Sequence, residues 1–392
     1  MSKRERRAIE ALCAIYASRL LGLYMVLPVL SPYADRLPQA TSLLTGLSLG
    51  IYGATQAIFQ VPFGTLSDRI GRRGGINIGL VLFAGGSILA ATAREAHLLV
   101  LGRALQGSGA ITSVILALIG DMTREEVRTQ AMAQVGIWIA GTFGFAVLAG
   151  PMIAGFFGVP VLFWITAAGA MVSLLYVNLA RLGSSSPGEV AAQEKIERLD
   201  LRGLLAVLRQ PPLLAVDVGI FLLHTIVTVL FVVMPFNLDR LVPPHRTWVI
   251  LVPAVAVGLV IIHAVGRYAK RERTIPLFFL GASLLPLSSL VLAFAERAPL
   301  AVLAGLLLFV IAIAVLEPIL ASLLSIFSDG PHRGTASGVY SLAQYGGTFI
   351  GGVVGGAFLH GRQGTMFLVL SLTSLAWMIG LTRVCLLYTS PS

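Results

Sequence analysis

Residues 64–73 read Gly-Thr-Leu-Ser-Asp-Arg-Ile-Gly-Arg-Arg and join two long apolar stretches, residues 43–66 and 75–93. Each stretch has about the 20 residues that cross the hydrocarbon core of a bilayer. Asp68 and three arginines are costly in lipid, so we place this segment in a tight turn at a membrane surface, where glycine supplies backbone freedom. There the carboxylate can interact with a helix N-terminus and an arginine can pair with a carboxylate. The segment is therefore a candidate latch that closes one side of the membrane.

The composition of the whole chain is that of a membrane protein. Of its 392 residues, 56% are hydrophobic and 12% are charged, whereas a soluble domain carries about 25% charged residues. The mean hydropathy is +0.88. We therefore expect an all-α membrane protein with twelve transmembrane helices. The predicted spans are 9–31, 43–66, 75–93, 97–120, 130–157, 160–180, 211–236, 247–266, 275–294, 299–325, 334–360 and 363–382.

The lysines and arginines predict the orientation of the chain. With a cytoplasmic N-terminus, 20 of the 28 lie in cytoplasmic segments, six lie outside, and two, Arg19 and Arg103, lie within spans. This bias predicts that both termini are cytoplasmic. The net charge of +10 is thus a topology signal, and no nucleic-acid partner is expected. The basic start precedes a long apolar stretch without a clean cleavage site, which predicts a retained first helix.

One long polar stretch separates two sets of six spans. Its charged segment is either a solvated linker or a short amphipathic helix on the inner membrane face. The two sets echo each other weakly, since Asp121 and Asp329 precede similar short sequences after the fourth and tenth spans. Duplication is usual in transporters and predicts a substrate site between the halves near the midplane. The expected parts are an N-terminal six-helix bundle at 1–180, a cytoplasmic linker at 181–210, a C-terminal six-helix bundle at 211–384 and a truncated or artefactual tail at 385–392.

Three motifs carry a resemblance to a known family. Arg103 with Gly107 is similar to the fourth-helix motif of the major facilitator superfamily. Gly150, Pro151 and Gly155 resemble the fifth-helix motif of its proton antiporters, although Ala154 replaces a usual glycine. The resemblance implies a major facilitator fold of twelve helices in two six-helix bundles. The family's signature loop is matched by Gly64, Asp68, Arg69, Gly71, Arg72 and Arg73.

Other stretches between about residues 10 and 380 resemble bacterial inner-membrane members of the drug:proton antiporter branch. This resemblance implies a proton-driven exporter. It also implies that Asp68 faces the N-terminus of the eleventh helix and that Arg72 pairs with Asp121. The members concerned continue into a small soluble cytoplasmic domain, whereas this sequence stops at Ser392 in residues that look like translated adapter.

Ionisable residues inside spans cost about 2.5–3.5 kcal/mol each and are candidates for function. Arg19 either attracts an anionic group or donates to backbone carbonyls, and Arg103 either acts in function or extends to the membrane surface. Glu317 is the candidate proton carrier because burial favours a neutral carboxyl group; alternatively, it pairs with a buried arginine. His224 titrates in the physiological range and either transfers protons or only packs. Asp217, near the cytoplasmic end of its span, is expected to be hydrated.

No enzymatic or ATP-driven activity is indicated. The chain has no GxxxxGK[ST] segment, and its GxSxG at residues 46–50 lies inside an apolar stretch. We expect a monomeric secondary transporter of the bacterial inner membrane, powered by a proton gradient without cofactor or metal. It would export small amphiphilic or drug-like molecules by alternating access. The alternatives are a uniporter or symporter of a small metabolite, or a receptor-like protein without transport.

Overall fold

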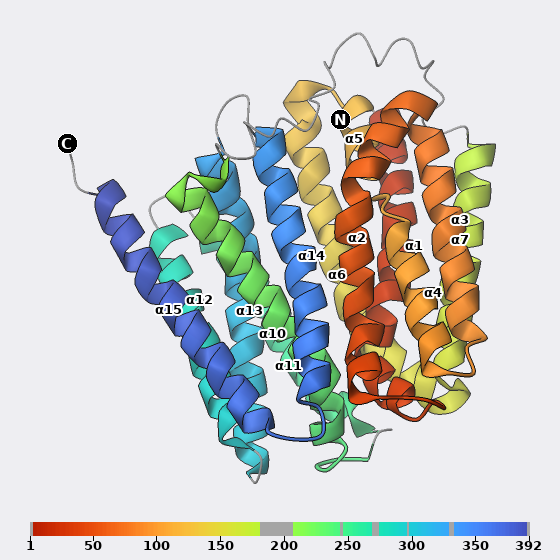
Figure 1. The fold of residues 1–392 in the computed structure, drawn as a ribbon. Coiled ribbons are helices and arrows are strands. Elements are labelled where there is room, and N and C mark those ends of the chain that lie inside the picture. The colour runs from red at the N-terminus through yellow and green to blue at the C-terminus, as the bar shows by residue number, and fades with distance from the viewer. Residues whose placement is uncertain are drawn as a thin grey trace. The chain divides into compact units, whose positions relative to one another are not determined.

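The computed structural model describes residues 3–180, 207–243, 246–268, 274–295, 298–328 and 333–389. The regular structure within these ranges is entirely helical (Figure 1). Helices cover all twelve predicted spans, the fourth with two helices, and eleven of these spans are long and apolar enough to cross a membrane. The remaining one, α14 (Arg333–Ala357), is rich in glycine. The prediction of an all-α membrane protein is confirmed.

The chain divides into two compact units, residues 1–197 and 198–392. Residues 181–206, most of the predicted linker, lie outside the described ranges, so the predicted domain boundaries stay predictions. The first unit contains α1 (Lys3–Asp35), α2 (Ser42–Ile70), α3 (Arg72–Ala91), α4 (Ala96–Ser108), α5 (Thr112–Asp121), α6 (Glu125–Phe157) and α7 (Val159–Leu179). The second contains α10 (Pro211–Leu238), α11 (Trp248–Tyr268), α12 (Thr274–Ala293), α13 (Pro299–Phe327), α14 and α15 (Gln363–Thr389).

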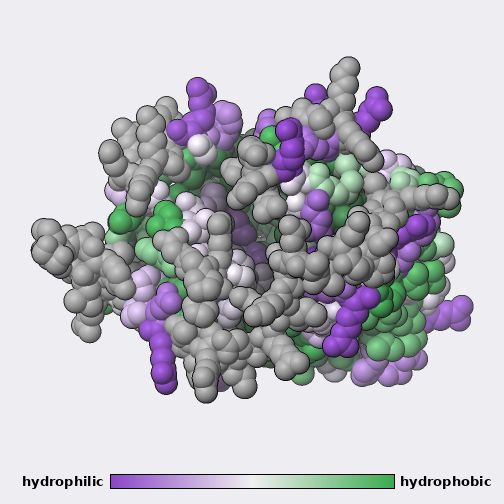
Figure 2. Space-filling model, turned by 90° about the horizontal axis from the view of Figure 1, so that it is seen from above, coloured by the Kyte–Doolittle hydropathy of each residue, from purple (hydrophilic) through white to green (hydrophobic). Residues whose placement is uncertain are grey.

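The first unit buries an apolar core and leaves apolar side chains on its outside. Helix α1 packs against α6, and α3 packs against α4 and α7. Leu12, Phe83 and Ile115 are fully or nearly fully buried between these helices, whereas Phe156 is 82% exposed. Such exposure suits a lipid-facing surface, because the bilayer core is as apolar as the side chain. Figure 2 views the end at which α1 begins, where hydrophilic residues project and apolar residues lie on the flank at the right.

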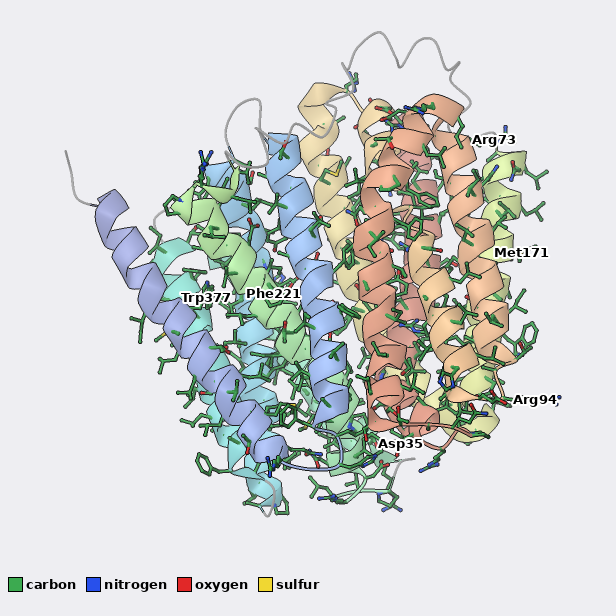
Figure 3. All side chains as sticks on the ribbon, viewed as in Figure 1. Asp35, Arg73, Arg94, Met171, Phe221 and Trp377 are labelled. Carbon is green, nitrogen blue, oxygen red and sulfur yellow. The ribbon has the colours of Figure 1, made fainter. Side chains whose placement is uncertain are left out.

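In the second unit, glycines bring α14 against α10. A Cβ added to Gly347 would overlap the carbonyl oxygen of Phe221, and one added to Gly351 would overlap that of Thr225. The absence of these side chains lets the two backbones approach closely, as small residues do in membrane helices. On the other flank, Trp377 of α15 donates from Nε1 to the Ala215 carbonyl of α10 at 2.9 Å. Figure 3 labels Phe221 and Trp377.

The segment at residues 64–73 is less of a loop than predicted. Helix α2 continues to Ile70 and α3 begins at Arg72, so Gly71 alone separates them. Gly71 has φ +85° and ψ 152°, a conformation open essentially to glycine only. Gly158 repeats it, with φ +81° and ψ 159°, between α6 and α7. One glycine, and not a run of turn residues, reverses the chain at each point.

The fourth span is not the single helix that was predicted over 97–120. It is broken at residues 109–111, between α4 and α5. A Cβ at Gly109 would overlap the carbonyl oxygen of Gly79 on α3. The break thus coincides with a close approach to the backbone of α3. At the other end of the protein, α15 extends to Thr389, into the segment expected to be a tail.

Candidate functional site

Arg72 joins the adjacent ends of α2 and α5 in the first unit. Its Nε donates to Asp121 Oδ2 at 3.1 Å, and its Nη1 donates to Asp68 Oδ1 and, at 2.9 Å, to Ser67 Oγ. The Arg72 side chain is 11% exposed, whereas the side chains of Asp68 and Asp121 are 34% and 40% exposed. The structure thus brings together the arginine and two carboxylates that the family resemblance groups. Their role as a latch stays a prediction. The expected contact of Asp68 with the start of the eleventh span, which is α14, also stays a prediction.

The other charged positions of the segment lie elsewhere. Arg73 Nη2 donates to the main-chain oxygen of Asn178 at 3.0 Å and to its Oδ1 at 2.9 Å. Asn77 and Asn178 exchange amide hydrogen bonds of 3.1 and 3.2 Å. Arg73, labelled in Figure 3, therefore links the start of α3 to the end of α7 by hydrogen bonds. Its hydrogen-bond partner is Asn178, and not the carboxylates that Arg72 contacts. Arg69 is exposed, and a Cβ at Gly64 would meet no atom within 4 Å.

Two buried arginines flank one face of α2. Ser48, Tyr52 and Gln56 occupy successive turns of that face, since they are four residues apart. Arg103 donates from Nε to the Ser48 carbonyl at 3.0 Å, and Arg19 donates from Nη2 to Gln56 Oε1 at 2.7 Å. The Tyr52 ring centroid is 5.1 Å from Cζ of Arg103 and 6.0 Å from Cζ of Arg19, within the range of cation–π attraction.

Neutral groups supply the remaining contacts of these arginines. Arg103 Nη1 donates to Gln106 Oε1 at 2.8 Å, and Gln106 donates to Ser87 Oγ at 2.7 Å. Arg19 Nη1 donates to Thr112 Oγ1 at 3.0 Å. In the described part of the chain no carboxylate pairs with either guanidinium, and Arg19 Nε and Arg103 Nη2 have no acceptor. Arg103 is 0% exposed, so it does not extend to the membrane surface.

The motif expected in the fifth span lies in α6, because α4 and α5 together form the fourth span. A Cβ at Gly150 would overlap the Met25 carbonyl of α1, so this glycine permits the close contact of α1 and α6. Pro151 follows inside the same helix. A Cβ at Gly155 would meet no atom within 4 Å. Packing thus explains Gly150, while the antiporter role of the three residues stays a prediction.

In the second unit, Gln344 of α14 links the two candidate proton groups. Its Nε2 lies 3.2 Å from Glu317 Oε1 on α13 and 3.0 Å from His224 Nε2 on α10. The amide nitrogen carries two hydrogens and can donate to both. His224 Nε2 then accepts, which places the proton of the neutral ring on Nδ1. That atom lies 3.9 Å from Glu317 Oε2, and neither atom has a hydrogen-bond partner in the described part of the chain.

The structure bears on one alternative that the sequence left open, an arginine partner for Glu317, and on the expectation for Asp217. Among the described residues Glu317 pairs with no arginine, and the ionisable side chain beside it is His224. Protonation of the imidazole at Nε2 would give a cation that forms an ion pair with an ionised Glu317, and an approach of about 1 Å would bring Nδ1–H within the 2.6–3.2 Å hydrogen-bond reach of Oε2. Asp217 corrects an expectation, since its exposure of only 5% means that it is buried in the second unit and not open to bulk water.

The sequence analysis missed the amides that organise both sites. Gln56 and Gln106 hold the two arginines of the first unit, and Gln344 bridges Glu317 to His224. Each is an isolated amide inside an apolar stretch, where an unpaired polar group is costly, and this signal was available. Their partners come from other helices, which sequence spacing alone does not reveal.

Comparisons with known proteins find a family model, curated relatives and solved structures that match this chain. A model of the Major Facilitator Superfamily matches residues 12–352. The inner membrane transport protein YajR of Escherichia coli (strain K12) is 38% identical over 359 residues, which cover 91% of this chain and 78% of that protein. The class E tetracycline resistance protein of Escherichia coli is 33% identical over 156 residues, covering 39% of this chain and 37% of that protein. A crystal structure of the nucleoside transporter NupG matches with a TM-score of 0.74 at 14% identity, covering 96% and 98% of the two chains.

Proposed function

The chain belongs to the Major Facilitator Superfamily, and we propose that it is a proton-coupled antiporter that exports small amphiphilic molecules by alternating access. We place it in a bacterial inner membrane with both termini cytoplasmic, acting as a monomer without cofactor. The proton gradient supplies the energy. In this proposal the contacts of Arg72 with Asp68 and Asp121 hold the cytoplasmic side closed, and they break when that side opens.

The observation that carries the proposal is the group formed by Glu317, Gln344 and His224. A carboxyl group and an imidazole face each other across 3.9 Å, both inside membrane-spanning helices. Such intramembrane pairs mark proton pathways, because their charges are too costly to be kept for packing alone. Imidazole and carboxyl groups are both able to bind and release a proton, so the pair is a candidate for the proton-coupling step.

An apolar hollow in the first unit supports an amphiphilic substrate. It has a volume of about 470 Å³, within the range of small-molecule sites, and lies between α1 and α6. Small side chains of α1, among them Ala14 and Ser18, form one wall, and Trp138 and Phe145 of α6 form the other. The buried Arg19 and Arg103 lack carboxylate partners in the described part of this unit, so anionic amphiphiles belong among the candidate substrates.

The test is the pH inside proteoliposomes that hold an imposed proton gradient. Lipophilic cations, neutral amphiphiles and anionic amphiphiles are added one at a time. We expect one class to trigger proton movement in the wild type, a loss of about 100-fold in Glu317→Gln, and a large loss in Asp68→Asn. Glu95→Gln, which removes a carboxylate from the loop before α4, is the matched control.

Each outcome separates the proposal from its alternatives. Compound flux that occurs equally with and without a proton gradient would indicate a uniporter. Proton movement in the same direction as the compound would indicate a symporter. A folded, inserted protein that transports none of the classes would support a receptor-like role.

A further inference from the structure

The hollow between α1 and α6 has an uncharged lining. Four residues of α1 and five of α6 form it, and none of these described residues carries a charge. Arg19 follows Ser18 in α1, but its guanidinium is bound to Gln56 of α2 and Thr112 of α5. A charged molecule in the hollow would lose hydration without meeting an opposite charge. The lining therefore favours an uncharged ligand.

Three polar groups of this lining have no hydrogen-bond partner in the part of the chain that the structure describes. They are the hydroxyls of Ser18 and Thr142 and the indole N–H of Trp138. Hydroxyls inside helices often donate to a main-chain oxygen of the preceding turn, as those of Ser48 and Thr166 do here. The three groups of the hollow are free to donate to a ligand instead. A ligand that satisfies them must carry a hydrogen-bond acceptor.

Gly141 keeps the hollow open on the α6 side. A Cβ added there would meet no atom within 4 Å, whereas one added to Gly150 of the same helix would overlap the Met25 carbonyl. A longer side chain at position 141 would therefore extend into the hollow and displace no protein atom. The rings of Trp138 and Phe145, which are 38% and 63% exposed, provide apolar faces for an aromatic ligand.

We propose that this hollow binds uncharged aromatic molecules that carry a hydrogen-bond acceptor, and that Gly141 sets the size of the molecule that fits. The ring of the ligand packs against Trp138 and Phe145, and its acceptor faces the hydroxyls of Ser18 and Thr142. The volume of about 470 Å³ suits a small molecule. This inference rests on the proposed function for transport and selects the neutral class among its candidate substrates, but binding is tested without transport.

The first test is binding of three dyes with the same dansyl ring system to the purified protein in detergent. Dansylamide is uncharged, dansyl sulfonate is an anion, and dansylcadaverine is a cation. Tryptophan emission excites a dansyl group that lies nearby, so dansyl emission after tryptophan excitation reports a dye beside Trp138. We expect saturable binding of dansylamide, with both charged dyes at least about tenfold weaker. Equal or tighter binding of either charged dye would overturn the proposal.

The second test fills the hollow. Gly141→Leu should weaken dansylamide binding by about tenfold or more, because the leucine side chain occupies the space of the ligand. Gly136→Leu is the matched control, since a Cβ at that position of α6 also meets nothing within 4 Å and Gly136 does not line the hollow. Unchanged binding in Gly141→Leu, or equal losses in the two leucine variants, would refute the site.

The hydroxyl groups are tested separately, so the proposal stays testable if Gly141→Leu does not fold. Ser18→Ala and Thr142→Val should each weaken dansylamide binding by about 2- to 10-fold, the range expected for one lost hydrogen bond. If both variants bind dansylamide as the wild type does, the hydroxyls do not hold the ligand and the proposed site is wrong.

Transport separates this inference from the proposed function. In proteoliposomes with a proton gradient, dansylamide should trigger proton movement that Gly141→Leu reduces more than Gly136→Leu does. Proton-driven export of charged compounds alone, unaffected by Gly141→Leu, would contradict this inference and leave the proposed function standing. Dansylamide that binds at the hollow but triggers no proton movement would support the binding site and count against the proposed antiport.

Discussion

At the scale of single residues, the two glycines of the signature segment have different physical roles. Gly71 adopts a conformation that other residues enter only at a cost of about 1–3 kcal/mol. Gly64 is inside α2, where a Cβ would meet nothing within 4 Å. Alanine at Gly64 should therefore gain helix propensity of up to about 1 kcal/mol.

We predict that Gly71→Ala lowers the thermal stability of the purified protein and that Gly64→Ala keeps or raises it. The pair is matched, because both variants add one methyl group to the same segment. Thermal unfolding in detergent measures both. Equal shifts in the two variants would show that the backbone conformation of Gly71 carries no cost.

The residues of the candidate sites were predictable to the extent that they are ionisable. Arg19, Arg103, His224 and Glu317 stand out because charge is rare within spans. The alternatives for Arg103 and Glu317 depended on neighbours that only the structure shows: Arg103 is 0% exposed, and the residue beside Glu317 is a histidine and not an arginine. The expectation for Asp217 failed because nearness to a helix end in sequence does not report which way the side chain faces.

At the scale of helices, the contact of α10 with α14 determines the geometry of the group formed by Glu317, Gln344 and His224. Gln344 reaches both His224 and Glu317 only while α14 lies close to α10, and Gly347 permits that approach. A larger residue at Gly347 would move the helices apart or distort them, at a cost of about 1–3 kcal/mol.

Gly347→Val should accordingly lower thermal stability and also weaken proton-driven flux, since Gln344 would lose one of its partners. Gly338→Val is the control, because a Cβ at that position of the same helix would meet nothing within 4 Å. The measurements are thermal unfolding and intravesicular pH. A Gly347→Val protein that keeps both properties would argue against the close contact of α10 and α14 at this glycine.

The helices themselves were largely predictable, because length and hydropathy locate membrane spans with little ambiguity. The break at residues 109–111 was not. Gly109 leaves the helix where it meets the Gly79 carbonyl, and that meeting depends on how α3 packs against α4 and α5. The apolar pattern of the sequence continues through residues 109–111, so only the tertiary structure reveals the break in the helix.

At the scale of the whole molecule, the charge bias of the loops predicts the orientation in the membrane. Thr92, in the exposed loop after α3, should lie outside, and Gln210, exposed before α10, should lie in the cytoplasm. In a background with Cys13→Ser and Cys385→Ser, Thr92→Cys should react with an impermeant maleimide on intact cells. Gln210→Cys should react only after the cells are permeabilised. The reverse pattern would mean that the protein is inserted upside down relative to the prediction.

The single-residue junction at Gly71 has a consequence for insertions and deletions. Surface loops of membrane proteins usually accept changes in length, but here α2 ends and α3 begins within one residue. One added residue would turn α3 by about 100° about its own axis relative to α2, since each helical residue contributes that angle. Arg72 would then point away from Asp121, and Arg73 away from Asn178. The number of residues in this segment is therefore as constrained as their identity, and length variants that keep every motif residue should still lose both contacts.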